Sequence, residues 1–105
     1  MAKGYWIACV DVHDAEGYGS YAAENPAIFR KFGGRFVVRG GRSTMVEGQG
    51  RSGNAVIEFP DFETALACYR SPEYQANIKR RQPHAVADLL IIEGYEGPQP
   101  DTDQM

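Results

Sequence analysis

Cysteine and histidine, the residues that most often build redox and metal sites, are scarce: the 105-residue chain has two of each. Cys9 and Cys68 lie inside apolar segments. A disulfide between them is allowed by count, but two free buried thiols in a reduced cytosol are the expectation. The cysteines do not have the spacing of a metal site, and His13 and His84 lie far apart in the sequence. We therefore predict no metal, no cofactor and a cytoplasmic location.

An excess of positive charge and a long apolar run are also missing. The net charge is −3 and the isoelectric point is near 5.3, whereas a nucleic-acid-binding domain usually has a basic face. The apolar stretch 5–10 is too short for a signal-peptide core and is followed at once by Asp11. No run approaches the roughly 20 apolar residues of a membrane span. We expect no targeting segment and neither nucleic acid nor membrane as a partner.

What is present fits one small domain with a modest core, since 43% of the residues are hydrophobic. We assign the domain to residues 1–96. The polar, proline-bearing tail 97–105, GPQPDTDQM, is predicted to be disordered.

The first half of the domain predicts a strand, a helix and a hairpin. Residues 4–12 are rich in aromatic and β-branched types, which favours a strand. Asp14 then caps a helix that ends at Gly33–Gly34. Pro26 falls inside this helix and either kinks it or starts a second helix capped by Asn25.

The hairpin is expected to span residues 35–59 and to be irregular. Its first strand is 35–39, interrupted by a bulge at Gly40–Gly41 and continued over 44–47. A polar, glycine-rich turn follows at 48–53, and 54–59 returns as the next strand.

The second half adds helices and a last strand. Asp61 caps one helix, Ser71 followed by Pro72 starts another over 72–82, and 87–95 is a strand. The order β-α-β-β-α-β, with its second helix in two pieces, is the ferredoxin-like pattern: an α+β fold with a four-stranded antiparallel sheet and its helices on one face.

The first and last strands are apolar on both faces, as in the run Leu89–Ile92. Helices cover one face only, and a sheet with one wet face shows clean alternation instead. A second copy of the chain is the economical cover for the other face. We predict a homodimer whose two sheets face each other.

Four segments together resemble a known family. They are KGYWIACVDV, KFGGRFVVRGG, VIEFPDFETALACYRSPEYQ and DLLIIEGY, and they extend over about residues 3–95. The sequence resembles the bacterial "domain of unknown function 1330" family of the dimeric α+β barrel superfamily. The resemblance implies the same ferredoxin-like fold and sheet-to-sheet dimer but no established reaction. More distant members of the superfamily include cofactor-free quinone-forming monooxygenases, haem-degrading monooxygenases and a lactone isomerase, an analogy of fold alone.

Arg39 is the first candidate for chemistry. The glycines around it lead into strand and not into a helix, so they do not form a phosphate-binding loop. By alternation Arg39 shares a face with Arg35 and Val37. It either pairs with Glu58 on the neighbouring strand, which only fixes the sheet or the dimer, or binds a carboxylate or enolate-like oxygen of a ligand.

The tyrosines are the second candidate, because buried hydroxyls need partners. They form either an aromatic core with hydroxyls at its rim or, with Asn25, the lining of a small-molecule pocket between helices and sheet. The predicted ligand-contacting residues are Tyr18, Tyr21, Asn25, Tyr69 and Tyr74.

The remaining candidates are weaker. His84 is a possible general base, although no acid beside it in the sequence pairs with it. The basic run Lys79–Arg81 is interpreted as a solvated helix end. The sequence thus predicts a homodimeric small-molecule-binding protein, with Arg39, Glu58 and His84 as catalytic residues if it is a cofactor-independent enzyme acting on a small carbonyl or anionic compound. The alternative is a non-catalytic structural dimer.

Overall fold

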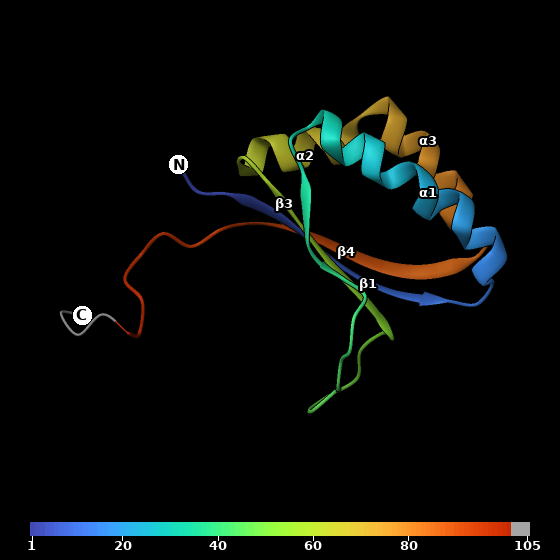
Figure 1. Ribbon diagram of the computed structural model, residues 1–105, viewed down its shortest axis with the longest axis horizontal. Coiled ribbons are helices and arrows are strands. Elements are labelled where there is room, and N and C mark those ends of the chain that lie inside the picture. The colour runs from blue at the N-terminus through green and yellow to red at the C-terminus, as the bar shows by residue number, and fades with distance from the viewer. Residues whose placement is uncertain (102–105) are drawn as a thin grey trace.

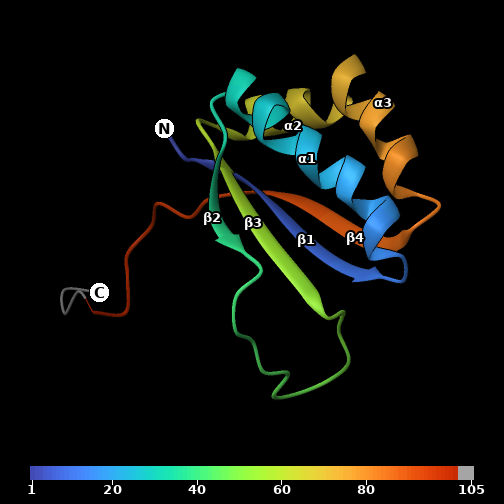
Figure 2. The same ribbon diagram turned by 45° about the vertical axis from the view of Figure 1, so that its right-hand side comes forward.

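The computed structural model describes residues 1–101 and has the predicted order of elements (Figure 1). Its order of strands across the sheet is β2-β3-β1-β4, and each neighbouring pair is antiparallel. All three helices cover one face, here called the inner face, and leave the outer face bare (Figure 2). The α+β, ferredoxin-like prediction is confirmed. The elements are β1 (Gly4–Val12), α1 (Ala15–Lys31), β2 (Arg35–Arg39), β3 (Gly53–Phe59), α2 (Phe62–Arg70), α3 (Pro72–Arg81) and β4 (Ala85–Glu93).

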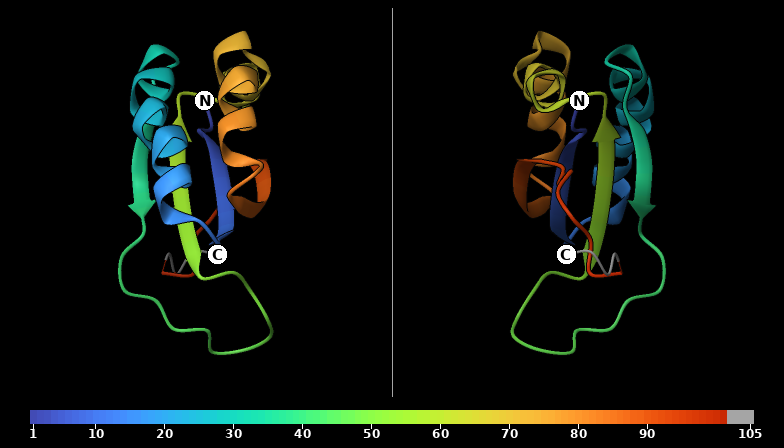
Figure 3. Two further views of the ribbon diagram at one scale, coloured as in Figure 1. Left: turned by 90° about the vertical axis from the view of Figure 1, so that its right-hand side faces the viewer. Right: turned by 90° about the vertical axis from the view of Figure 1, so that its left-hand side faces the viewer.

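The helices begin where their capping residues predict. The side chain of Asp14 accepts a hydrogen bond from the amide of Gly17, and Asp61 and Ser71 cap α2 and α3 in the same way. Pro26 lies within a single helix, so Asn25 does not start a second one. α1 and α3 pack side by side over the sheet (Figure 3).

The hairpin differs from the prediction in the place of its bulge. The register shifts between Phe36 and Val38, so Val37 is the extra residue, and β2 ends at Arg39. Residues 40–52 contain no helix or strand, so the expected continuation over 44–47 is wrong; this loop projects away from the sheet (Figures 2 and 3). Gly40 and Gly41 have positive φ angles of 66° and 87°, which allow the chain to turn out of the strand there.

The bulge reverses the side on which Arg39 lies. An extra residue breaks the two-residue alternation, so every side chain after it changes face. Phe36 pairs with Ile57 and Arg39 pairs with Ala55, and these two partners share one face of β3. Arg39 therefore lies on the inner face with Phe36, and the prediction that it shares the face of Arg35 is wrong.

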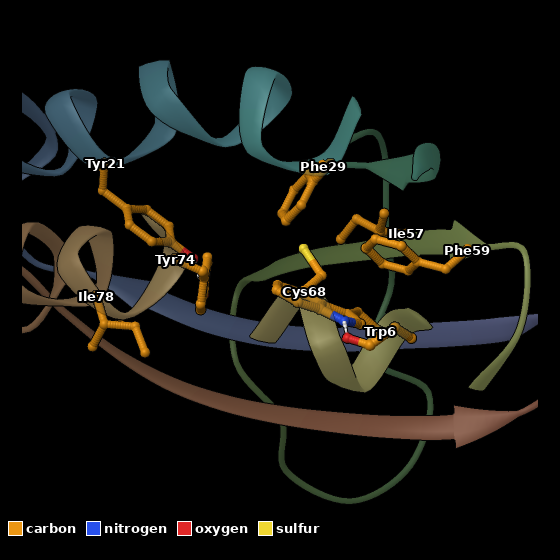
Figure 4. Packing of buried hydrophobic residues seen from close by; sticks show 9 residues of the cluster. Trp6, Tyr21, Phe29, Ile57, Phe59, Cys68, Tyr74 and Ile78 are labelled. Carbon is orange, nitrogen blue, oxygen red and sulfur yellow. Dashed lines mark hydrogen bonds between the residues drawn. The ribbon is translucent and has the colours of Figure 1, made fainter. Parts of the chain in front are cut away.

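The core lies between the helices and the inner face. Trp6 is 1% exposed, and its indole nitrogen donates a hydrogen bond to the carbonyl of Ala65 over 2.8 Å (Figure 4). Phe29 meets its ring edge to face at 5.0 Å, and Tyr74 does so at 4.8 Å. Cys68 is fully buried in the same cluster. Both cysteines are free, as predicted, but the expected burial of Cys9 is wrong, because Cys9 is partly exposed on the outer face of β1.

The outer face carries an uncovered apolar row that crosses all four strands. Val38 pairs with Val56, Val56 with Ile7, and Ile7 with Leu90. We call these four residues the outer row. Leu90 is 55% exposed, far more than a core residue.

The tail predicted to be disordered falls partly outside the described residues. Residues 97–101 contain no helix or strand, and 102–105 are not described. Within residues 1–101 no helix is long and apolar enough to cross a membrane.

Candidate functional site

A cavity of about 260 Å³ lies between the helices and the inner face of the sheet. Its floor includes four small residues from three strands, Ala8 of β1, Gly53 and Ala55 of β3, and Ala87 of β4, beside the larger side chains of Val10, Val12, Ile57 and Leu89. Next to this floor, Trp6 fills the space beneath the helices with a large ring. The cavity therefore opens where the strands place a methyl group or a hydrogen beneath α1.

The rest of the lining is mainly aromatic. The sheet contributes Trp6 and Phe36, and the helices contribute rings from successive turns of α1 and from α3. A largely apolar concave site with a few polar groups is typical of small-molecule binding. The helix residues that line it are Tyr18, Tyr21, Ala22, Asn25, Phe29, Tyr74 and Arg81.

Arg39 brings a positive charge to the edge of this cavity from β2. Its guanidinium carbon lies 4.3 Å from the centre of the Phe36 ring, a cation–π contact. Within residues 1–101 it has neither an ion pair nor a hydrogen bond through its side chain, so the predicted alternative of an Arg39–Glu58 pair is wrong.

Arg81 brings a second positive charge from the last turn of α3, where the sequence predicted only a solvated helix end. Its Nη1 donates to the hydroxyl of Tyr74 over 3.2 Å and to that of Tyr21 over 3.4 Å. The two hydroxyls lie 2.5 Å apart and share a hydrogen bond (Figure 4 shows the two rings). The spacing of Tyr74, Ile78 and Arg81 places all three on one face of α3, a signal that would have marked Arg81 as inward-facing.

The hydroxyls of Tyr18 and Tyr74 are protonated donors at neutral pH. Burial raises the pKa of Tyr74, and the neighbouring Tyr21 raises it further. Burial also raises the pKa of Tyr18, and Tyr21 raises it further; together they outweigh the charges of Arg81 and Arg39, which lower it. These phenols can therefore donate a hydrogen bond to a ligand oxygen.

Asn25 lies on the cavity side of α1, and its side chain has a buried hydrogen-bond partner there. Asn77, fully buried on α3, donates from Nδ2 to Oδ1 of Asn25 over 2.9 Å and to the carbonyl of Tyr21 over 3.1 Å. Nη1 of Arg80 in turn donates to Oδ1 of Asn77 over 3.0 Å. This chain of hydrogen bonds fixes α1 against α3 and thereby holds one wall of the cavity.

Glu58 lies on the outer face, away from the cavity. It accepts hydrogen bonds from Nε of Arg35 over 3.0 Å and from the hydroxyl of Tyr5 over 3.1 Å. The hydrogen bond from Arg35 contributes most to lowering the pKa of Glu58. Arg39 lies on the inner face, so the structure does not bring Glu58 and Arg39 together. A carboxylate on the outer face also cannot exchange a proton directly with a ligand in the cavity.

His84 is also absent from the cavity lining. Its Nδ1 lies 3.0 Å from a carboxylate oxygen of Asp14, the residue that caps α1. This acid partner of His84 could not be predicted from the sequence, because Asp14 is distant in the chain and meets His84 only through the fold. This pair ties the start of β4 to the start of α1.

Tyr69 belongs to the aromatic core and does not line the cavity. Its ring lies 5.5 Å from that of Tyr74 and 6.0 Å from that of Trp6. Of the five predicted ligand-contacting residues, the structure thus brings four to one cavity; contact with a ligand stays a prediction.

Metal binding finds no support in the part of the chain that the structure describes. Residues 1–101 contain no group of three or more His, Cys, Asp or Glu side chains placed to hold a metal ion.

Comparison with solved structures finds similar folds. A protein of unknown function from Rhodopseudomonas palustris has a TM-score of 0.73 and 19% identity, over 91% of this chain and 85% of that one. The cofactor-independent oxygenase SnoaB from Streptomyces nogalater has a TM-score of 0.61 and 13% identity, over 96% of this chain and 100% of its own. A dimeric protein of unknown function with a ferredoxin-like fold from Bacteroides fragilis has a TM-score of 0.59 and 14% identity, over 87% of this chain and 95% of that one.

Comparison with curated proteins finds no match. The model of one family, described as domain of unknown function (DUF1330), matches residues 3–95. This match extends from the start of β1 to just beyond the end of β4 and includes every helix and strand that forms the cavity. The chain belongs to the family described as domain of unknown function (DUF1330).

Proposed function

We propose that the protein is a homodimer that binds a small organic molecule in the cavity between its helices and its sheet. The observation that carries this proposal is the combination of small residues on the cavity floor with aromatic walls and the guanidinium of Arg39 at its edge. A packed structural core would fill such a volume, because protein interiors are close-packed. The cavity of about 260 Å³ lies just below the range of about 300–1,000 Å³ for drug-sized ligands, which suits a compound with one ring.

The homodimer is supported by the bare outer row and by the dimeric relative from Bacteroides fragilis. A second copy of the chain presents the same row, so a two-fold axis pairs apolar surface with apolar surface. The cavities lie on the inner faces and stay separate in such a dimer.

A second candidate function, catalysis without a cofactor, is favoured by the likeness to SnoaB, a cofactor-independent oxygenase. The substrate would be a small carbonyl or anionic compound held in the cavity. The cavity offers Tyr18 and the Tyr21–Tyr74 pair as proton donors and Arg39 and Arg81 as stabilisers of negative charge. Glu58 and His84 lie outside the cavity, so a direct proton transfer would fall to the tyrosines.

The test is native mass spectrometry of freshly purified protein, followed by denaturing release of any bound compound. A dimer with a stoichiometric small molecule supports the proposal and identifies the ligand class. A bare dimer that takes up no compound from a metabolite extract favours the non-catalytic structural dimer instead. A bare monomer contradicts the proposed interface.

Matched variants locate the ligand. Arg39→Ala removes the charge at the cavity edge and is expected to weaken binding about 10- to 100-fold, as for loss of a charged hydrogen bond. Arg35→Ala is its control, because Arg35 lies on the same strand but pairs with Glu58 on the outer face. Equal affinity in both variants would remove Arg39 from the site.

A further inference from the structure

We infer that the ligand is a small aromatic carboxylate, held by its acid group between Arg39 and Arg81 beside Tyr18, with its ring toward Trp6. This inference rests on the proposed function and names the ligand class for the same cavity. The proposed function names only a small carbonyl or anionic compound. This inference names a narrower ligand class and assigns Arg81, which the sequence analysis placed at a solvated helix end, as a second residue that binds the acid group.

The charges around the cavity are all of one sign. The lining includes the two arginines and no Asp, Glu or His, although the whole chain has a net charge of −3. Low-dielectric walls strengthen the field of charges that line a hollow and concentrate ions of opposite sign there. The cavity of this acidic protein therefore attracts an anion.

Neither of these guanidiniums has a carboxylate partner within residues 1–101, whereas Arg35 of β2 and Arg51 of the loop 40–52 do. Arg35 pairs with Glu58 at 3.0 Å, and Arg51 pairs with Asp11 and Asp88 at 3.1 and 2.9 Å. Arg81 is half-buried, and its hydrogen bonds to phenol oxygens use Nη1. A guanidinium presents five N–H donors in a planar fork, so its remaining donors are suited to a carboxylate.

Both arginines line the cavity together with Tyr18. Arg81 reaches it beside the hydroxyls of Tyr21 and Tyr74, and Arg39 reaches it over the ring of Phe36. Tyr18 makes no side-chain hydrogen bond within residues 1–101, and its ring packs 5.3 Å from that of Tyr21. The lining of one cavity therefore combines two guanidiniums with a phenol hydroxyl, all of which can donate hydrogen bonds to an acid group.

The cavity becomes apolar away from these donors. Tyr18 lies in the first turns of α1, and Phe29 lies near the end of the same helix above Trp6 and Ile57 (Figure 4). The sheet beneath them contributes apolar side chains, Ala8, Ala55 and Leu89 among them. A ligand that satisfies both ends has an acid group at one end and a flat apolar ring at the other.

The chain provides its own reporter, since Trp6 is its single tryptophan and lines the cavity. The probes are phenylacetate and phenylacetamide, which share a ring and a shape and differ in charge. Quenching or shift of Trp6 emission gives the dissociation constant of each. We expect phenylacetate to bind at least 10-fold more tightly than phenylacetamide, because hydrogen bonds to charged groups contribute more than neutral ones.

Variants assign the charge preference to residues. Arg81→Gln and Arg39→Gln should each reduce the preference for phenylacetate about 10-fold, whereas Lys79→Gln on the exposed side of α3 and Arg35→Gln on the outer face should leave it unchanged. If Arg81→Gln fails to fold, Arg81→Lys replaces it: the charge remains but the planar fork is lost, so the preference for phenylacetate should decrease without disappearing.

The outcomes separate this inference from the proposed function. Equal affinity for the two probes in the wild-type protein overturns the carboxylate assignment and leaves small-molecule binding standing. A charge preference that survives in both arginine variants also overturns it. If neither probe changes Trp6 emission, the aromatic carboxylate is refuted as the ligand class. A bare protein in native mass spectrometry that takes up nothing from an extract refutes the proposed function as well.

Discussion

The sharpest consequence of the proposed dimer concerns Leu90, at the end of the outer row. Burying a whole leucine side chain contributes about 1.5–3 kcal/mol, so covering its exposed half contributes about 0.8–1.5 kcal/mol in each subunit. The two-fold axis repeats every change, so Leu90→Asp removes about 1.5–3 kcal/mol from association. The dimer should then dissociate about 10- to 150-fold more readily. This is a lower limit, since each new carboxylate must also lose water at the interface.

Sedimentation equilibrium of Leu90→Asp over a range of concentrations measures this effect. The control is Val46→Asp, which adds the same charge to a residue 89% exposed in the loop 40–52, outside the outer row. Far-UV circular dichroism establishes that both variants are folded. A Leu90→Asp variant that remains folded and as strongly dimeric as Val46→Asp would refute the assignment of the outer row as the interface.

Three further predictions concern the single subunit. Gly4→Ala places a Cβ atom 2.4 Å from the backbone oxygen of Asp61, which should destabilise the fold by about 3 kcal/mol or more in urea unfolding; unchanged stability would contradict this contact. Burial raises the pKa of the Cys68 thiol to about 12, so an aromatic disulfide reagent should leave Cys68 unmodified in the native protein at neutral pH and react with it only after unfolding. The pKa values of Asp14 and Glu58 are lowered, chiefly by hydrogen bonds from Gly17 and Arg35, so the stability these carboxylates contribute is complete above about pH 5 and is lost as the pH falls below about 4. A melting temperature that does not fall between pH 5 and pH 3 would contradict this last prediction.

Local signals in the sequence were sufficient for the element order. The caps Asp14, Asp61 and Ser71 act within three residues of themselves, so their pattern is visible in the sequence. The unalternating strands likewise reveal that the sheet is apolar on both faces. Topology then follows, because few arrangements of four strands and their helices bury one core.

Contacts between residues far apart in the chain could not be predicted from the sequence. His84 meets Asp14, and Arg81 meets Tyr21 60 residues earlier in the chain, only because α1, α3 and β4 converge in the fold. The cavity was predicted in place, between helices and sheet, from the tyrosines and Asn25. The prediction that Arg39 pairs with Glu58 was wrong because it depended on the position of one bulge. Glycine is common at bulges, so the sequence predicted the bulge at Gly40–Gly41, whereas it lies at Val37.

The bulge at Val37 is what places a charge in the cavity, and this can be tested without any ligand. In a regular strand that kept every residue, Phe36 facing inward would put Arg39 outward, because their separation is odd. Deleting Val37 removes the bulge, so that Phe36, Val38 and Arg39 become consecutive residues of a regular strand. Phe36 can then still pair with Ile57 and Arg39 with Ala55. The shortened protein should therefore keep Arg39 inside, whereas an alanine inserted between Val38 and Arg39 should turn it outward.

Proton–proton contacts in NMR spectra distinguish the two variants. In the deletion variant the Arg39 side chain should still contact the Phe36 ring, as its guanidinium does now at 4.3 Å from the ring centre. In the insertion variant these contacts should vanish while those between Phe36 and Phe29, now at 5.6 Å between ring centres, persist. If the deletion abolishes the Arg39–Phe36 contact with β2 still paired to β3, the bulge does more than restore alternation, and the local backbone twist that a bulge adds must aim this arginine at the cavity.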